Sequence, residues 1–417
     1  MASDSTDPGA SLSTAPAPVG VAALELESGL APETTSDSWL VVGSSMLIGT
    51  ASLMILGIQP VLLGALTQEG RISEASLGRL ATVEVLALAI GSAIGVRILR
   101  QGKIAGKIAL GSLLLAAFNG LIYFSHAPFM LFFTRGVAGL LEGFILGAAI
   151  VVITHSRSPD RLNGLFLAVQ TIPQAALAYA LPVSILPRVG ADGGFAILAG
   201  LAAIAAVASF VLTERHPPRV EEAHSSKNVW TLPVLGILLA IVLQNAAIGG
   251  AWDYAERIAV QYRIPPNLVG SALSASLLFQ VAGAFAVAWF AWRLPFRIVT
   301  VLGPLCQAVV IALIASAGSS TVYLAATATF GLFWLALSPY QVRLMIDMEP
   351  TRQAVLIGTA ITLFGLSAGP SLSSFGVSPG DVRGAFWIAS GLMLLSSATF
   401  AISMIAHYRS KAAVQPV

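Results

Sequence analysis

The side chains that could do chemistry in this sequence are few, and they lie inside long apolar runs. Six ionisable groups of these runs could take part in such chemistry, namely Glu84, Arg135, Glu142, Asp253, Glu256 and Arg257. A carboxyl group in surroundings of low dielectric favours its protonated form, so it can take up and release a proton near neutral pH. The predicted proton-coupling groups are therefore the four acids of this set: Glu84, Glu142, Asp253 and Glu256.

A stripe of small residues runs along one predicted helix. Residues four positions apart lie on one face of a helix, and this face carries Arg135, Gly139, Gly143 and Gly147. Glycines on such a face let a neighbouring backbone approach closely. We expect Arg135 to pair with Glu84 or Glu142 and to face a central cavity, as an ion-pair partner or a substrate anchor. The alternative is a buried ion pair that only locks helices together.

The partner of Arg135 decides which acid could carry a proton. A carboxyl held by an arginine stays ionised, because the opposite charge favours its charged form. The other carboxyl is then the better carrier, and the sequence leaves open whether this is Glu84 or Glu142.

Uncharged polar side chains also occur deep in the apolar runs, at Gln59, Gln170, Gln174, Gln244, Asn245 and Gln280. Each alone is typical of a hydrogen bond between helices, worth about 0.6 kcal/mol. As a group they suit a cavity for a small amphipathic organic solute. The predicted substrate-cavity residues are Gln59, Arg135, Gln170, Gln174, Asn245, Trp252, Trp334 and Tyr340.

For two of the apolar runs the sequence leaves two interpretations open. In the run around Trp252, the charged and aromatic residues suit either a gate or a belt at the lipid headgroups. Glu256 and Arg257 are adjacent, so they should point in different directions and not pair. The segment from Trp334 to Tyr340 is interrupted by Pro339, which suits either a flexible, solute-binding break or a plain kink.

Several chemistries are excluded by missing motifs. The sequence has no phosphate-binding glycine loop, no nucleophile elbow and no Cys or His spacing for a metal. We therefore predict no metal, no cofactor and no enzymatic activity. The single cysteine, Cys306, excludes a disulfide framework and is expected to be a small buried core residue.

Composition shows which elements must position these groups. The chain has 417 residues, of which 56% are hydrophobic and 10% charged, and its mean hydropathy is +0.84. This leaves too little polar surface for a water-soluble domain and predicts an integral membrane protein. A net charge of +2 gives no reason to expect nucleic-acid binding. The unbroken apolar runs predict transmembrane helices rather than a β-barrel.

Twelve such helices are predicted. Their spans are 39–64, 75–98, 105–124, 129–154, 162–187, 194–213, 230–257, 267–292, 297–317, 321–347, 353–377 and 383–407. Fifteen of the 22 Lys and Arg residues lie at one set of helix ends, loops and tail, and five at the other. Basic residues favour the cytoplasmic side, so both termini are predicted to be cytoplasmic, in the inner membrane of the cell.

The polar stretches divide the chain into five segments. These are a disordered tail at 1–38, a six-helix bundle at 39–213, a cytoplasmic linker at 214–228, a second six-helix bundle at 229–407 and a tail at 408–417. The expected fold class is an all-α membrane protein with twelve transmembrane helices in two pseudo-symmetric six-helix bundles. Two bundles of equal helix number are typical of secondary transporters.

The architecture and three short motifs resemble the major facilitator superfamily. The loop after the second span carries Gly95, Arg100, Gly102 and Lys103, similar to that family's G-x-x-x-D-R-x-G-R, with Leu99 in place of its aspartate. The fourth span carries Arg135-Gly-Val-Ala-Gly139, similar to its drug and proton antiporters. Their fifth-span G-x-x-x-G-P is absent there and occurs in the eleventh span, ending at Pro370.

What the resemblance implies is a gating loop and a solute path. The gating loop would be Arg100, Gly102 and Lys103. Helices 1, 4, 7 and 10 would line the path, which selects Gln59, Arg135, Glu142, Asn245, Asp253, Trp334 and Tyr340. Together these inferences predict a monomeric, proton-coupled secondary transporter of a small organic solute, with efflux slightly favoured. A proton-independent facilitator, an uptake symporter and, more remotely, a membrane enzyme or receptor remain alternatives.

Overall fold

The computed structural model describes residues 38–99, 103–154, 159–212, 230–290, 293–351 and 353–414. Almost the whole predicted N-terminal tail, the predicted linker at 214–228, and Arg100 and Gly102 of the predicted gating loop lie outside these ranges. The first part of the described chain forms α1 (Trp39–Gln68), α2 (Glu74–Leu99), α3 (Ile104–Gly120), α4 (Pro128–Thr154), α5 (Pro159–Ala180) and α6 (Leu186–Ala208). The second part forms α7 (Leu232–Asp253), α8 (Ala255–Gln261), α9 (Pro266–Phe290), α10 (Phe296–Ala315), α11 (Ser320–Ala336), α12 (Ser338–Met348), α13 (Gln353–Ser374) and α14 (Arg383–Val414).

These helices fall on the predicted spans. Ten stretches of the described residues are long and apolar enough to cross a membrane, and one of them, Gly164–Val211, covers the fifth and sixth predicted spans. α13 has 22 residues and lies on the eleventh predicted span. The chain is therefore an all-helical multi-pass membrane protein, as its composition predicts.

Two predicted spans are interrupted, the seventh and the tenth, and the chain bends between the fifth and the sixth. Tyr254 separates α7 from α8, and Leu337 separates α11 from α12 just before Pro339. The predicted break in the tenth span is thus present, because a proline cannot donate the backbone hydrogen bond that a continuous helix needs. In α6, Gly190 has a φ of 63°, a left-handed conformation that glycine adopts without steric cost.

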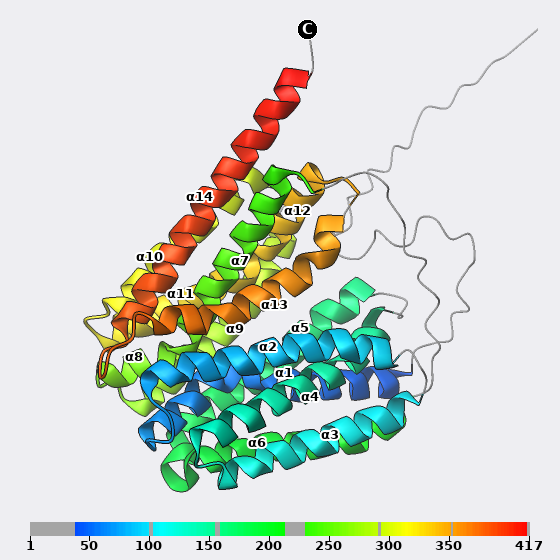
Figure 1. Cartoon of the computed structure of the whole chain (residues 1–417), viewed down its shortest axis with the longest axis vertical. Helices are drawn as coiled ribbons and strands as arrows, with labels where there is room; N and C mark the ends of the chain where they lie inside the picture. Colours follow the sequence, from blue (N-terminus) through cyan, green and yellow to red (C-terminus); the bar gives the residue numbers. More distant parts are fainter. Residues whose placement is uncertain are drawn as a thin grey trace, which may run out of the picture.

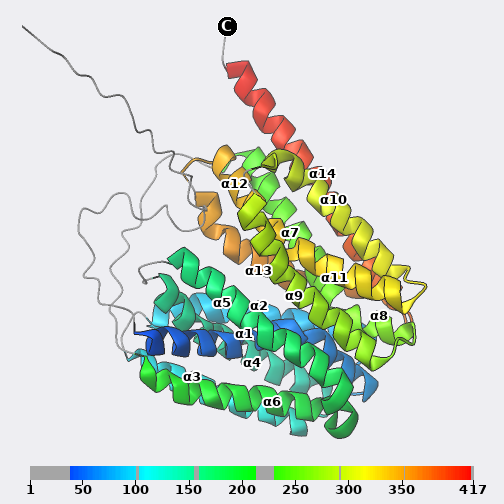
Figure 2. The ribbon, with the colours of Figure 1, turned by 180° about the vertical axis from the view of Figure 1, so that it is seen from behind.

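The helices form two sets that meet at one end of the molecule. In Figures 1 and 2, α1 to α6 lie together, and α7 to α14 form a second group inclined to them. The groups converge at the end that holds α8 and diverge towards the opposite end, where α3 begins and α12 ends. α14 continues as a helix to Val414, past its predicted end at 407, since its last turns contain good helix formers such as alanine and lysine.

The closest helix pair in the first group is α2 and α4, and glycines make the contact possible. A Cβ atom at Gly139 would lie 2.2 Å from the Glu84 carbonyl oxygen, and one at Gly143 would lie 2.0 Å from that of Leu88. On the other helix, a Cβ at Gly91 would lie 2.1 Å from the Leu140 carbonyl oxygen. The predicted glycine stripe therefore brings the backbone of α2 against α4.

One prediction about the core is wrong. Cys306 is exposed on the outer face of α10, beside the exposed Leu305. In a membrane protein the outer face contacts lipid, which is as apolar as the core, so a hydrophobic run does not tell which of its residues are buried.

Substitution Gly143→Ala should destabilise the protein by about 1–3 kcal/mol, because the new methyl group meets backbone atoms that cannot rotate away. The matched control is Gly200→Ala on α6, where a Cβ meets nothing within 4 Å. The control should leave stability unchanged or slightly raised, since alanine favours a helix over glycine. Apparent unfolding temperatures in detergent test this, and equal temperatures for both variants would contradict tight α2–α4 packing.

Candidate functional site

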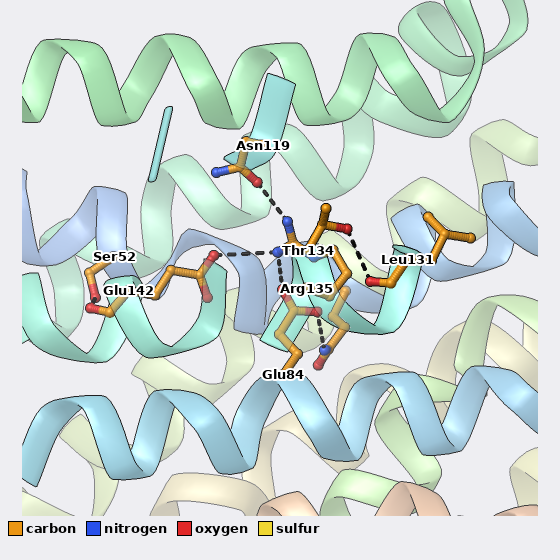
Figure 3. A network of polar contacts seen from close by, with 8 residues as sticks. Ser52, Glu84, Asn119, Leu131, Thr134, Arg135 and Glu142 are labelled. Carbon is orange, nitrogen blue, oxygen red and sulfur yellow. Dashed lines mark hydrogen bonds and ion pairs between the residues drawn. The ribbon is translucent and has the colours of Figure 1, made fainter. Parts of the chain in front are cut away.

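Arg135 and Glu84 form a fully buried ion pair between α4 and α2. The Arg135 Nη2 donates to Glu84 Oε1, and both side chains are 0% exposed. Figure 3 shows the two side chains meeting between the helices. The predicted pairing of Arg135 with a carboxyl is therefore present, and Glu84 is its principal partner.

The remaining contacts of this pair come from three further helices. The Arg135 Nη1 donates to Asn119 Oδ1 on α3 at 2.7 Å, and the guanidinium carbon lies 4.9 Å from the centre of the Phe195 ring on α6. Gln59 on α1 donates from Nε2 to the other oxygen of Glu84 at 3.1 Å. Arg135 thus lies inside the first group of helices, enclosed by side chains of α1, α2, α3, α4 and α6.

Glu142 is held much less firmly than Glu84. Its Oε1 lies 3.4 Å from Arg135 Nη2, while its Oε2 is buried without a hydrogen-bond partner. The backbone carbonyl of Glu142 accepts a hydrogen bond from the Ser52 hydroxyl of α1 at 2.5 Å, which fixes the helix rather than the carboxyl (Figure 3). One carboxyl of this cluster is therefore well paired and the other is only partly paired.

Asp253 brings a third carboxyl to the same region from the second group of helices. It is the last residue of α7, is 2% exposed, and lies close enough to Glu84 for the two carboxylates to repel each other. Among the described residues it has no hydrogen-bond or ion-pair partner. Two of the three buried acids, Glu84 and Glu142, thus share the guanidinium of Arg135, and Asp253 has no cation of its own in the described chain.

A second polar cluster joins the two groups of helices at their converging end. Gln68 of α1 donates to Glu256 Oε1 of α8 at 2.9 Å, and a Cβ at Gly64 would lie 2.0 Å from Glu256 Oε2. Contrary to the prediction, Arg257 pairs with its neighbour Glu256, at 2.7 Å from Nε and 3.0 Å from Nη2. The helix restarts at Ala255 after the break at Tyr254, so both residues lie in its first turn, where long side chains can fold towards each other.

Further hydrogen bonds close the same end. The Tyr254 hydroxyl donates to the Glu74 carbonyl at 3.0 Å and accepts from the Gly78 amide at 3.2 Å. The Trp252 indole donates to the Leu56 carbonyl at 2.8 Å. The Ser371 amide at the end of α13 donates to the Thr82 hydroxyl of α2 at 3.1 Å. These bonds tie α1 and α2 to α7 and α13.

The loop before α14 completes this closed end. The Gly380 amide donates to the Glu74 carboxylate at 3.0 Å, and Gln261 donates to Asp381 at 2.9 Å. Hydrogen bonds from Arg383 and Gln261 lower the pKa of the Asp381 carboxyl, so it stays ionised at any working pH. A fixed negative charge thus anchors the loop at the helix end.

The predicted cavity residues divide between helix contacts and unpartnered groups. Gln174 donates to the Leu53 carbonyl at 2.6 Å, and Asn245 to the Ile241 carbonyl of its own helix at 2.9 Å. Trp252 and Trp334 meet edge to face, with ring centres 5.5 Å apart. In contrast, buried polar atoms without a hydrogen-bond partner occur on Gln170 and Tyr340, and also on Gln280, which is not among the predicted cavity residues.

Three participants were not found from the sequence. Asn119 and Phe195 complete the surroundings of Arg135, and Tyr254 links α7 to α2. Asn119 could have been noticed as the polar residue of an apolar run, but an aromatic ring such as Phe195 carries no such signal. Lys103 of the predicted gating loop has a φ of 53° and precedes α3. In the described chain, no group of three His, Cys, Asp or Glu side chains is placed to hold a metal ion.

Removing either charge of the Arg135–Glu84 pair should destabilise the protein by about 3–5 kcal/mol, because the partner is left buried and unpaired. The double variant Arg135→Gln/Glu84→Gln should lose much less than the sum of the two single variants. Apparent unfolding temperatures of the four proteins give the coupling. If the losses of the two single variants simply add, the pair does not stabilise the helices.

The arrangement of helices is similar to that of known transporters. An alanine-substituted variant of the nucleoside transporter NupG matches with a TM-score of 0.70 at 12% identity, over 87% of this chain and 99% of that chain. NupG gives a TM-score of 0.65 at 13% identity, over 87% and 99%. A bacterial homologue of the human lysosomal transporter Spinster, inward-facing and unoccupied, gives 0.65 at 12%, over 88% and 96%.

No protein-family model matches the sequence, and no curated protein matches it. At identities this low, the structural likeness establishes the fold and nothing finer. The chain has the fold of these solved transporter structures.

Proposed function

We propose that this protein is a proton-coupled secondary transporter that moves a small amphipathic organic solute by alternating access. It acts as a monomer in the inner membrane of the cell, with both termini cytoplasmic, and exports its solute. The two groups of helices at 39–213 and 229–407 are the moving bodies.

The observation that carries the proposal is the one-sided contact between these bodies. Within the described ranges, the hydrogen bonds that join them lie between the converging end and the middle of the helices. Towards the other end the helices diverge (Figures 1 and 2). By the distribution of basic residues the closed end is the outer end, so this is an inward-facing state.

The cluster around Arg135 supports a role for protons. If Glu84, Glu142 and Asp253 were all ionised, the buried cluster would carry two uncompensated negative charges, which is costly within a membrane. Glu84 is held by Arg135 and Gln59, so the protons belong on Glu142 and Asp253. Because Glu84 is the principal partner of Arg135, we assign Glu142 rather than Glu84 as a proton carrier, together with Asp253. Glu256 is paired with Arg257 and is better suited to holding the outer end closed.

Unpartnered amides and aromatic rings support an organic solute. Gln170 on α5 and Gln280 on α9 belong to helices that pack across the boundary between the two bodies, and each leaves a buried polar atom free to bind a solute. The half-buried Trp334 offers a ring face next to Trp252. Amide and aromatic groups together recognise a molecule with both polar and apolar parts.

A proton-independent facilitator is the second candidate. The full enclosure of Arg135 and Glu84 favours it, because a pair without access to water could hold helices together and take no part in transport. The two candidates differ in whether a pH gradient drives the solute.

Coupling is tested by flux in proteoliposomes. A thermal-shift screen first finds a compound that raises the unfolding temperature, since a ligand stabilises the native state that binds it. With that compound, Glu142→Gln and Asp253→Asn should abolish most of the flux driven by a pH gradient while exchange of the solute without a gradient continues. Asp192→Asn, which removes an acid paired with Arg71 at the closed end, is the matched control and should retain coupling.

Gradient-driven flux that survives in Glu84→Gln, Glu142→Gln and Asp253→Asn would exclude these acids as carriers. Flux that ignores the gradient in the unaltered protein would instead establish the facilitator. Turnover or signalling without solute movement would leave only an enzyme or a receptor.

Alternating access is tested by locking the closed end. In a Cys306→Ser background, Thr82→Cys and Ser371→Cys place thiols on α2 and α13, whose native side chain and amide are 3.1 Å apart. A short bifunctional methanethiosulfonate, which forms a disulfide with each thiol and releases sulfinate, should stop transport, and reduction of these disulfides by an added thiol should restore it. The control pair, Val301→Cys and Ser397→Cys, links α10 to α14 within one body and should leave transport intact. Transport that continues in the locked protein would exclude opening at this end.

A further inference from the structure

A groove lies between α10 and α14, away from the boundary between the two bodies. Its volume is about 600 Å³, and its apolar lining consists of Val301, Ala401, Met404 and Ile405. The three residues of α14 share one helical face, because they are three and four positions apart. The groove is thus an apolar channel along the outer surface of the second group of helices.

The two helices separate at this point for a structural reason. Deeper in the membrane they are bound together, by the Ser390 hydroxyl to the Ala308 carbonyl at 3.0 Å and by the Ser397 hydroxyl to the Val301 carbonyl at 2.8 Å. One turn further along α14 stands the small residue Ala401, which leaves the floor of the groove open. The groove therefore begins where the serine contacts end.

Two arginines stand at the mouth of the groove, Arg297 and Arg409. They lie at the ends of the tenth and fourteenth helices that the basic residues predict to be cytoplasmic, at the level of the lipid headgroups. Arg409 is exposed and has no ion-pair or hydrogen-bond partner among the described residues. Its guanidinium is free to bind an anion.

Arg297 is held in place by an aromatic ring and one carboxylate. Its guanidinium carbon lies 4.1 Å from the centre of the Tyr408 ring, and its side chain is 52% exposed. One Nη2 hydrogen bond goes to Asp347 at 3.3 Å, and the Tyr408 hydroxyl also donates to that carboxylate. Stacking on the ring fixes the plane of the guanidinium and leaves its other N–H donors for a second anion. Arg343, stacked on Phe296, adds a further positive charge to this end.

We propose that this groove binds an anionic phospholipid of the adjacent leaflet. The phosphate is bound by Arg297 and Arg409, and one acyl chain lies along Val301, Ala401, Met404 and Ile405. Two arginines against the single carboxylate of Asp347 give the mouth a net positive charge, which an anionic headgroup complements. This lipid site is independent of the proposed transport cycle. It lies within one group of helices, away from the boundary between the two groups, and does not depend on which solute is transported.

The test measures lipid binding directly. Purified full-length protein in an uncharged detergent is titrated with phosphatidylglycerol, and bound lipid is counted by native mass spectrometry. Arg297→Gln/Arg409→Gln should weaken the affinity by roughly tenfold or more, as expected for two arginines near an anionic headgroup. The matched control, Arg97→Gln/Arg161→Gln, removes two exposed arginines of the first group of helices and should change nothing.

Two further measurements separate the headgroup from the chain. Ala401→Phe keeps every charge but fills the floor of the groove, and it should also weaken binding. Free glycerol phosphate should not displace the lipid, because it lacks the chain. Unfolding temperatures without lipid confirm that each variant is folded.

Three outcomes would overturn the proposal. Equal weakening in the control pair would show general attraction to a basic surface, and unchanged binding in Ala401→Phe would show that the groove holds no chain. Displacement by glycerol phosphate as effective as by the lipid would show a phosphate site instead of a lipid site.

Discussion

The constraint on which the first half of this molecule depends is the burial of one guanidinium. A charged group in the middle of a membrane is costly unless it is paired and hydrogen-bonded. Arg135 meets that need through Glu84 and Asn119, while Phe195 covers its face. Only a close approach of α2 to α4 allows the pair to form, and glycines on both helices permit that approach. The ion pair thus depends on the glycine stripe, which allows the two helices to approach closely enough for the pair to form.

Because Arg135 pairs mainly with Glu84, the three buried acids differ in how many partners compensate their charge. Glu84 has two firm partners, whereas Glu142 has one distant contact and Asp253 has none among the described residues. Protonation neutralises an acid that no cation compensates. It thereby lowers the free-energy cost of enclosing the cluster away from water. Because Asp253 belongs to α7 and Glu84 to α2, their repulsion acts across the boundary between the two groups of helices. In the proposed transport cycle, a proton on Asp253 would remove this repulsion and so change how closely the two groups of helices approach each other.

The lipid around the protein explains why apolar residues cover its outer face while polar residues lie inside. Lipid is as apolar as a protein core, so apolar residues such as Cys306 and Leu305 are stable on the outer face, while amides, acids and arginines gather inside. Charge returns to the surface at the helix ends, where headgroups and water meet. There Arg297 and Arg409 lie beside an apolar groove, so one small site combines charged groups that favour water with an apolar surface that favours lipid.

The sequence by itself determined the helical class, the spans, the break before Pro339 and the burial of Arg135 beside a carboxyl, because each depends on local hydropathy, proline geometry or four-residue spacing. The choice of Glu84 over Glu142, the pairing of Glu256 with Arg257, and the roles of Asn119 and Phe195 were decided by tertiary structure alone. They depend on which faces of α1, α2, α3, α4, α6 and α8 turn towards each other. In a membrane every face is apolar, so hydropathy gives no signal for that rotation, and packing between helices has to set it.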